Sequence, residues 1–146
     1  MAFERWRRLI PGLWAGWTLC VALLATPAPF ATLERHEAGR VVAPMLAQEA
    51  YTSLALGILL LVLERVAARR GAARQFSVEF ALVLGTLACT VAGYFAVQPM
   101  MAAARAGQGA LSFGQLHAVS TAFFVVKGLL ILALAWRASV SPAPSS

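Results

Sequence analysis

The chain has 146 residues, of which 60% are hydrophobic and only 12% charged, whereas an ordinary globular domain carries roughly 25% charged residues. A mean hydropathy of +0.75 excludes a soluble domain, a secreted disulfide scaffold and a disordered tail, because a soluble protein this small is mostly surface. The net charge is +6, but the basic residues flank apolar runs instead of sharing a face. This pattern is typical of membrane topology signals and excludes nucleic acid as a partner. The expected environment is the lipid bilayer.

Four apolar stretches follow one another along the chain, each near the ~20 residues that cross a hydrocarbon core. They cover about 9–30, 42–63, 76–97 and 113–136, with hydrophilic connectors between them. The sequence therefore predicts an all-α membrane protein, an antiparallel bundle of four transmembrane helices within residues 1–138. Residues 139–146 are rich in Ser and Pro and predict a flexible cytoplasmic tail.

The orientation follows from the Arg residues beside the spans. Eight of them flank the N-terminus, the second connector and the end of the fourth span, against three at Arg35, Arg40 and Arg105. Because the more basic side faces the cytoplasm, both termini are predicted to be cytoplasmic. The first stretch also resembles a signal peptide, but Pro27 and Pro29 disrupt its cleavage sites, which favours an uncleaved helix.

Of the three charged residues inside the spans, Glu79 and Lys127 predict an intramembrane ion pair. Lys127 lies about fourteen residues into the fourth stretch, which brings it nearer the cytoplasmic side, and Glu79 lies near the start of the third. A Lys side chain can extend toward the surface and reach that depth. A structural pair, or a Lys that simply reaches the headgroups, is the favoured interpretation, with a proton or ion relay as the alternative.

A second group of polar residues is expected on the periplasmic side, comprising Glu49, Gln98, His117 and Ser120. His117 and Ser120 are three residues apart on one predicted helix face, and Lys127 lies on nearly the same stripe. Glu49, Thr52 and Ser53 share a face of the second helix. The bonding capacity of a neutral imidazole predicts that Gln98 and Ser120 satisfy His117, without metal or haem. A ligand site remains the alternative.

Small residues at four-residue spacing predict close helix packing. They are Gly12 and Gly16 in the first stretch, and Gly85, Cys89 and Gly93 in the third. The pattern alone does not separate packing within one chain from self-association. Trp14 lies near other tryptophans and is interpreted as a partly interfacial anchor.

Catalytic and cofactor motifs are missing from the sequence. It contains no Asp, no HExxH or CxxC motif and no serine-centred elbow. Cys20 and Cys89 have no nearby partner, which argues against a disulfide or a zinc site. We therefore expect no enzyme activity, no cofactor and no bound metal.

The second half of the chain carries a more specific pattern. Gln98-Pro99 is followed by an Ala-rich linker and then by Phe113-Gly114-Gln115-Leu116-His117-Ala118-Val119-Ser120. This resembles the transmembrane protein 205-like family, whose bacterial members are grouped as domain of unknown function 4149. The resemblance implies four membrane helices, with the Gln-Pro pair ending the third, and implies no chemical activity. Glu49, Glu79 and Lys127 are not features of that family, and Ala47 stands where an aromatic residue is common.

The expected function is that of a small bacterial inner-membrane protein without catalysis. It would act as an interaction module or accessory subunit, with a protein partner in the membrane or a second copy of itself. The alternative is a protein that handles a metal, haem or small solute through the polar cluster around His117.

Overall fold

The computed structural model describes residues 2–71 and 73–140, and every regular element within them is helical. Four helical rods are long and apolar enough to cross a membrane: Phe3–Thr32, Arg35–Arg69, Val78–Arg105 and Phe113–Val140. The prediction of an all-helical protein with four candidate membrane spans is confirmed.

Two of the four rods are divided by short π-helices. The first rod contains α1 (Ala2–Cys20), η1 (Val21–Ala25) and α2 (Pro27–Thr32), and the second is α3 (Arg35–Arg69) alone. The third rod contains α4 (Val78–Thr90), η2 (Val91–Ala96) and α5 (Val97–Arg105), and the fourth is α6 (Phe113–Val140). The helices extend beyond the apolar stretches because charged residues are compatible with helix outside the hydrocarbon core. In α3, Glu37 in the first turn and Arg69 in the last complement the helix dipole.

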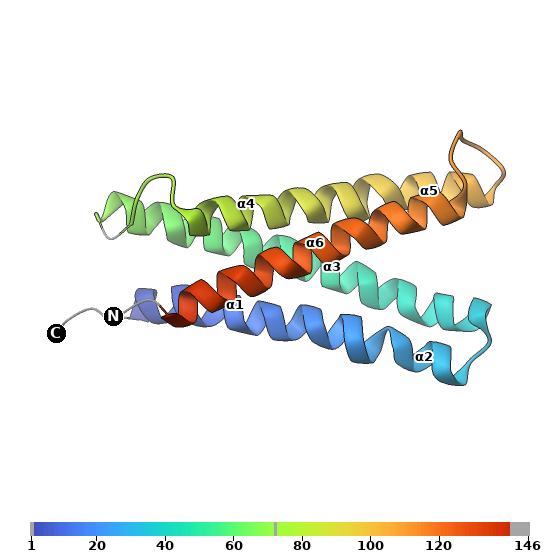
Figure 1. The fold of residues 1–146 in the computed structure, drawn as a ribbon, viewed down its shortest axis with the longest axis horizontal. Helices are drawn as coiled ribbons and strands as arrows, with labels where there is room; N and C mark the ends of the chain where they lie inside the picture. Colours follow the sequence, from blue (N-terminus) through green and yellow to red (C-terminus); the bar gives the residue numbers. More distant parts are fainter. Residues whose placement is uncertain (1, 72, 141–146) are drawn as a thin grey trace.

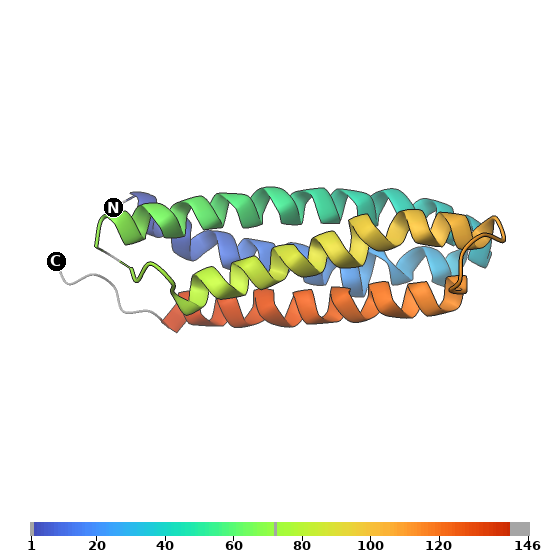
Figure 2. The same ribbon diagram turned by 90° about the horizontal axis from the view of Figure 1, so that it is seen from above.

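The rods form a bundle in which α1, α3, α4 and α6 each contact two neighbours, and α3 lies diagonally opposite α6. Figure 2 shows α3 and α6 along opposite edges. The start of α1, the end of α6 and the loop between α3 and α4 lie at one end (Figure 1), which we name the terminal end. The opposite end carries loops 33–34 and 106–112 and is named the two-loop end.

The main apolar core lies toward the terminal end. Its large buried side chains come from all four rods and are Ile10, Trp14, Leu60, Val83, Ile131 and Leu134. A smaller cluster of Val97, Met101 and Leu116 packs α5 against α6 near the two-loop end. Between these two clusters the interior of the bundle is polar.

The two π-helices both precede prolines. Segment η1 is followed by Pro27 and Pro29, and η2 is followed by Pro99. A proline inside an α-helix removes a backbone hydrogen bond, and a local change to π geometry accommodates the freed groups. The helix therefore continues through Pro99 to Arg105, and the prediction that Gln98-Pro99 ends the third helix is wrong.

Loop residues fix where the last helix begins. The Ser112 backbone N–H donates to Gln115 Oε1 at 2.9 Å, and the Gln115 N–H donates to Ser112 Oγ at 3.3 Å, the reciprocal arrangement of a capping box. Gly107 and Gly109 adopt positive φ angles in the preceding loop, which glycine tolerates without strain. At the other end of α6, Ser139 and Val140 are still helical, whereas the rest of the predicted tail, 141–146, lies outside the described residues.

Candidate functional site

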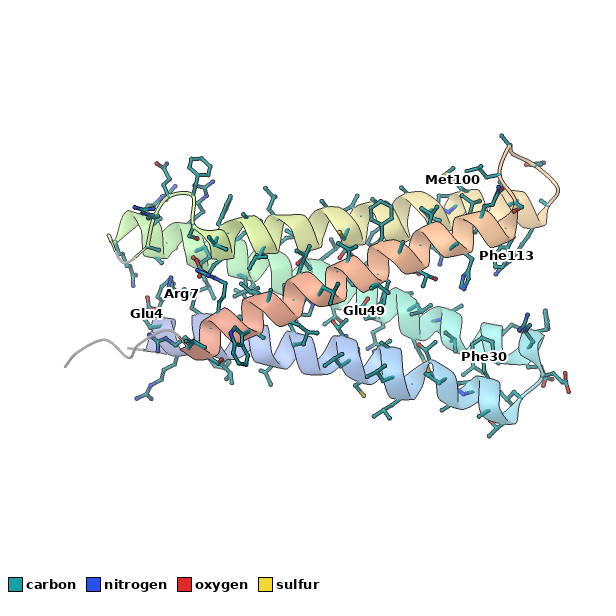
Figure 3. All side chains as sticks on the ribbon, in the orientation of Figure 1. Glu4, Arg7, Phe30, Glu49, Met100 and Phe113 are labelled. Atoms are coloured by element: carbon teal, nitrogen blue, oxygen red, sulfur yellow. The ribbon has the colours of Figure 1, made fainter. Side chains whose placement is uncertain are left out.

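The centre of the bundle contains a buried ion pair. Lys127 Nζ of α6 contacts Glu49 Oε2 of α3 at 2.5 Å, and the two side chains are 4% and 2% exposed. Figure 3 places Glu49 about midway along the bundle, where α6 crosses α3. The pair thus joins the two diagonally opposite helices through the interior.

The second carboxylate oxygen of Glu49 is also fully engaged. Glu49 Oε1 accepts a hydrogen bond from Ser53 Oγ at 2.8 Å and another from Thr18 Oγ1 at 3.3 Å. Ser53 Oγ in turn accepts from the indole Nε1 of Trp14 at 3.0 Å. These hydrogen bonds to a charged acceptor offset part of the cost of removing Glu49 from water. Three helices, α1, α3 and α6, therefore supply one connected network.

The pair forms because its members lie at the same depth. Glu49 is the fifteenth residue of α3 and Lys127 the fifteenth residue of α6. Both helices begin at the two-loop end (Figure 1), so each residue lies about 21 Å from its helix start at 1.5 Å per residue. Lys127 also lies over the ring of Phe124, with Nζ 4.5 Å from the centroid, where the ring attracts the cation.

A cavity of about 50 Å³ adjoins the ion pair. Its polar lining comes from α3, α4, η2, α5 and α6 and comprises Glu49, Thr90, Tyr94, Gln98, Ser120 and Lys127. A water molecule needs about 10–15 Å³ of such volume, so the cavity has room for a few molecules of that size.

Two hydroxyl groups around this cavity, those of Ser120 and Thr90, donate their protons to backbone carbonyl oxygens. Ser120 Oγ donates to the Gly93 carbonyl oxygen at 2.7 Å, and Thr90 Oγ1 donates to the Thr86 carbonyl oxygen at 2.9 Å. Each hydroxyl has two lone pairs and one proton, so both can only accept further hydrogen bonds from a molecule in the cavity. The donors in the lining are the Lys127 ammonium, the Gln98 amide and the Tyr94 hydroxyl, of which the last two can also accept.

The structure corrects the predicted pairing of Glu79 with Lys127. Glu79 lies in the first turn of α4 and pairs with Arg137 of α6, whose Nη2 is 2.7 Å from Glu79 Oε1. Lys127 lies more than two helical turns away from Arg137 and pairs with Glu49. The prediction failed because the second helix was taken to begin near residue 42, which placed Glu49 too close to the membrane surface.

The predicted polar cluster forms only in part. Glu49, Gln98 and Ser120 line one cavity together with Lys127, but His117 does not. His117 is exposed and its ring stacks on Phe113, with centroids 5.9 Å apart. Three residues of helix correspond to 300°, so Ser120 points inward while His117 is displaced by about 60° toward the outside. The prediction that Gln98 and Ser120 satisfy His117 is therefore wrong.

Two network residues were not recognised as part of a site, although a signal for them exists. Trp14 was interpreted as an interfacial anchor, yet it is completely buried, and Thr18 was not considered. The two are four residues apart and therefore share one helix face. That face meets Glu49 and Ser53, which have the same spacing on α3.

The small residues fall into two groups. A Cβ atom added at Gly93 would lie 2.5 Å from Phe123 Cβ, and one added at Gly85 would lie 3.2 Å from Leu130 Cδ1. These two glycines therefore permit the close approach of the third rod to α6, and Cys89 lines the cavity. Gly12 and Gly16 are exposed, and no atom of the described residues lies within 4 Å of an added Cβ, so nothing in the described part of the chain packs against them.

The terminal end has its own charged contacts. Glu64 is buried; its Oε1 lies 3.6 Å from Arg7 Nη1, and its Oε2 accepts from Ser77 Oγ at 3.4 Å. These contacts tie α1, α3 and the start of α4 together. Among the described residues, no three His, Cys or Glu side chains gather where they could hold a metal ion, and both cysteines are free.

One comparison with known proteins gives a match. The family model described as "Domain of unknown function (DUF4149)" matches residues 9–110, more than half of the chain. This range includes Glu49, the cavity residues of α4 and η2, and Gln98. No curated protein and no solved structure matches the chain.

Proposed function

We propose a function from the premise that the chain belongs to the DUF4149 family, whose description names a domain of unknown function and no activity. The function is that of an interaction module or accessory subunit in a membrane assembly, without catalysis of its own. Its partner is another membrane protein or a second copy of the chain, reached through the outer face of α1.

The observation that carries this proposal is the open small-residue face of α1. Gly12 and Gly16 lie one turn apart on the outside of the bundle, with open space beside each. Glycine in a helix interior costs about 0.5–1 kcal/mol relative to alanine, and no packing by residues 2–71 or 73–140 offsets that cost. Close approach of a helix from another protein would offset it.

We also propose a location and an orientation for the bundle, namely the bacterial inner membrane with both termini cytoplasmic. The support is the unequal distribution of arginine: eight lie at the terminal end and three, Arg35, Arg40 and Arg105, at the two-loop end. The wider relationship to the transmembrane protein 205-like family is supported by the Gln98-Pro99 pair and by His117-x-x-Ser120.

The test of the partner face is photo-crosslinking in intact membranes. A photoreactive amino acid replaces Gly16, and the crosslinked mass is compared with that obtained from position 128 on α6, where Gly128 also has open space beside it. We expect a protein adduct of defined mass from position 16 and only lipid adducts from position 128. Lipid adducts alone from both positions would contradict the proposal.

A second measurement asks whether the face stabilises the assembly. The double variant Gly12→Leu, Gly16→Leu should release the partner during purification in mild detergent, while Gly128→Leu should retain it. Melting temperatures of the purified chains should remain similar, because no residue of this chain fills the space at these positions.

The orientation is tested by single cysteines on a background in which Cys20 and Cys89 are replaced by serine. A cysteine at position 105 should react with a membrane-impermeant maleimide added to intact cells, and a cysteine at position 70 should not. Labelling of position 70 from outside would overturn the proposed orientation.

A further inference from the structure

The cavity beside the ion pair lies entirely in one half of the bundle. Its deepest lining residues are Glu49 and Lys127, while Gln98 and Ser120 lie about two turns closer to the two-loop end. On the terminal side Ile131 lies one turn beyond Lys127 and has no exposed surface. At the same level the hydroxyls of Ser53 and Thr86 are buried and bonded within the protein, and the apolar core follows. Movement of a polar molecule past the pair would therefore require it to enter a closely packed apolar layer.

The packing of the rods is looser toward the two-loop end. There α2 packs on α3 and α5 packs on α6, and Figure 1 shows these two helix pairs diverging from each other. The side chains of Tyr94 and Gln98 line the cavity and are only partly buried. Gln98 lies on α5, the part of its rod that leads to the two-loop end, so the polar lining of the cavity extends toward that end.

The hydrogen-bonding groups of the cavity fit water better than an anion or a lipid chain. Ser120 and Thr90 can only accept from a molecule in the cavity, since their protons are given to backbone carbonyls. Lys127 donates to Glu49 and has further N–H groups, which require acceptors in so apolar a surrounding. Water donates and accepts at the same time, whereas an anion offers no donor and an acyl chain offers neither.

We propose that this cavity is a water-filled vestibule, open only at the two-loop end, that admits water and similarly small polar solutes to the Glu49–Lys127 pair. The vestibule is independent of the partner face on α1, because its lining comes from α3 to α6. It gives the pair contact with one side of the membrane and none with the other.

The test uses neighbouring positions on α6 that differ only in direction. On the cysteine-free background, Ser120→Cys faces the cavity, while Val119→Cys is 42% exposed before substitution and faces outward at the same depth. The probe is 2-aminoethyl methanethiosulfonate, added to one side of proteoliposomes with free cysteine on the other side to consume any reagent that crosses the bilayer as the neutral amine. It reacts with the thiolate, so a wet cysteine should react at least about tenfold faster than one in lipid.

The expected result is rapid labelling of Ser120→Cys from the two-loop side, slow labelling from the terminal side, and slow labelling of Val119→Cys from both. Equal rates at the two positions would overturn the vestibule, as would faster reaction of Ser120→Cys with an apolar maleimide, since lipid would then occupy the space. Labelling of Ser120→Cys from the terminal side would overturn the closed apolar layer.

Ser120→Cys removes the hydrogen bond from Ser120 to the Gly93 carbonyl, so a second pair of positions repeats the comparison with this bond intact. Gln98→Cys should react rapidly from the two-loop side, and Ala96→Cys, which is exposed on the outside of the same rod, should react slowly. Labelling of Arg105→Cys marks the two-loop side in every preparation. If the proposed orientation is wrong, the two-loop end faces the cytoplasm, and the comparison of labelling rates from the two sides of the membrane is unchanged.

Discussion

The two ion pairs of α6 are made from the same kinds of groups but lie in different surroundings. The side chains of Lys127 and Glu49 are 4% and 2% exposed, whereas those of Arg137 and Glu79 are 46% and 27% exposed. The inner pair crosses the bundle between diagonal helices, and the outer pair joins neighbours at the terminal end. The same Coulombic contact therefore has different consequences at the two places.

The difference lies in what each charge does when its partner is lost. A carboxylate at the position of Glu79 can turn toward water or headgroups, so an exposed pair contributes only about 0–1 kcal/mol. Glu49 is only 2% exposed and is held by Thr18, Ser53 and Lys127. The cavity of about 50 Å³ beside it has room for only a few water molecules, which hydrate a carboxylate far less than bulk water does. Once either charge is buried at this place, the opposite charge is needed beside it. The pair as a whole need not stabilise the bundle more than two apolar side chains of similar volume would.

The largest predicted effect is the loss of one inner charge. Lys127→Met should lower the free energy of unfolding by about 3–5 kcal/mol, because Glu49 is left buried without a counter-charge. The melting temperature in detergent, followed by circular dichroism, measures the loss. The double variant Glu49→Gln, Lys127→Met should recover most of it. If the two single losses simply add in the double variant, the pairing in the structure is contradicted.

The second effect tests the close packing around the inner pair. Gly93→Ala places a Cβ 2.5 Å from Phe123 Cβ, and relief of this contact would have to move α6 at the point where the Ser120 hydroxyl bonds to the Gly93 carbonyl. Overpacking of this kind costs about 1–3 kcal/mol. Gly128→Ala is the matched control on α6, where an added methyl has open space, and it should leave the melting temperature unchanged or raise it.

The third effect concerns the hydroxyl support of Glu49. Ser53→Ala removes a donor to Glu49 and the acceptor of the Trp14 indole, which should cost about 1–2 kcal/mol. The fluorescence of the tryptophans should also change, because Trp14 loses its hydrogen bond. Thr52→Ala, on the neighbouring position of α3, is the control. An equal loss in both variants would show that the network has no special role.

The sequence was sufficient for the spans and for part of the site. Long apolar runs mark membrane helices directly, because few other arrangements satisfy the backbone in lipid. The four-residue spacing of Glu49 and Ser53 correctly placed the two on one face. The stripe through Ser120 and Lys127 was also correct, since both line the cavity.

The pairing of charges was not predictable in the same way, because it depends on depth and rotation. An error of seven residues in the start of α3, at Arg35 instead of 42, shifts Glu49 by about 10 Å along the axis. A rotation of 60° decides that Ser120 faces Gly93 while His117 stacks on Phe113 at the surface. Hydropathy carries little information on either quantity when polar residues extend a helix beyond the membrane.

The smallest predicted effect is at the outer pair. Glu79→Gln should change the free energy of unfolding by no more than about 1 kcal/mol, because the exposed Arg137 keeps access to water when its partner is neutral. Dissolved ions weaken contacts between exposed charges, so even this difference should shrink as salt is raised from low to high concentration. The loss caused by Lys127→Met should persist at high salt, because the pair is at most 4% exposed and the cavity of about 50 Å³ beside it holds too few water molecules for bulk ions to screen the charges. Melting curves of Glu79→Gln and Lys127→Met, each recorded at a low and at a high salt concentration, test both predictions. A salt-insensitive loss at Glu79 as large as that at Lys127 would mean that the terminal end is as closed as the centre.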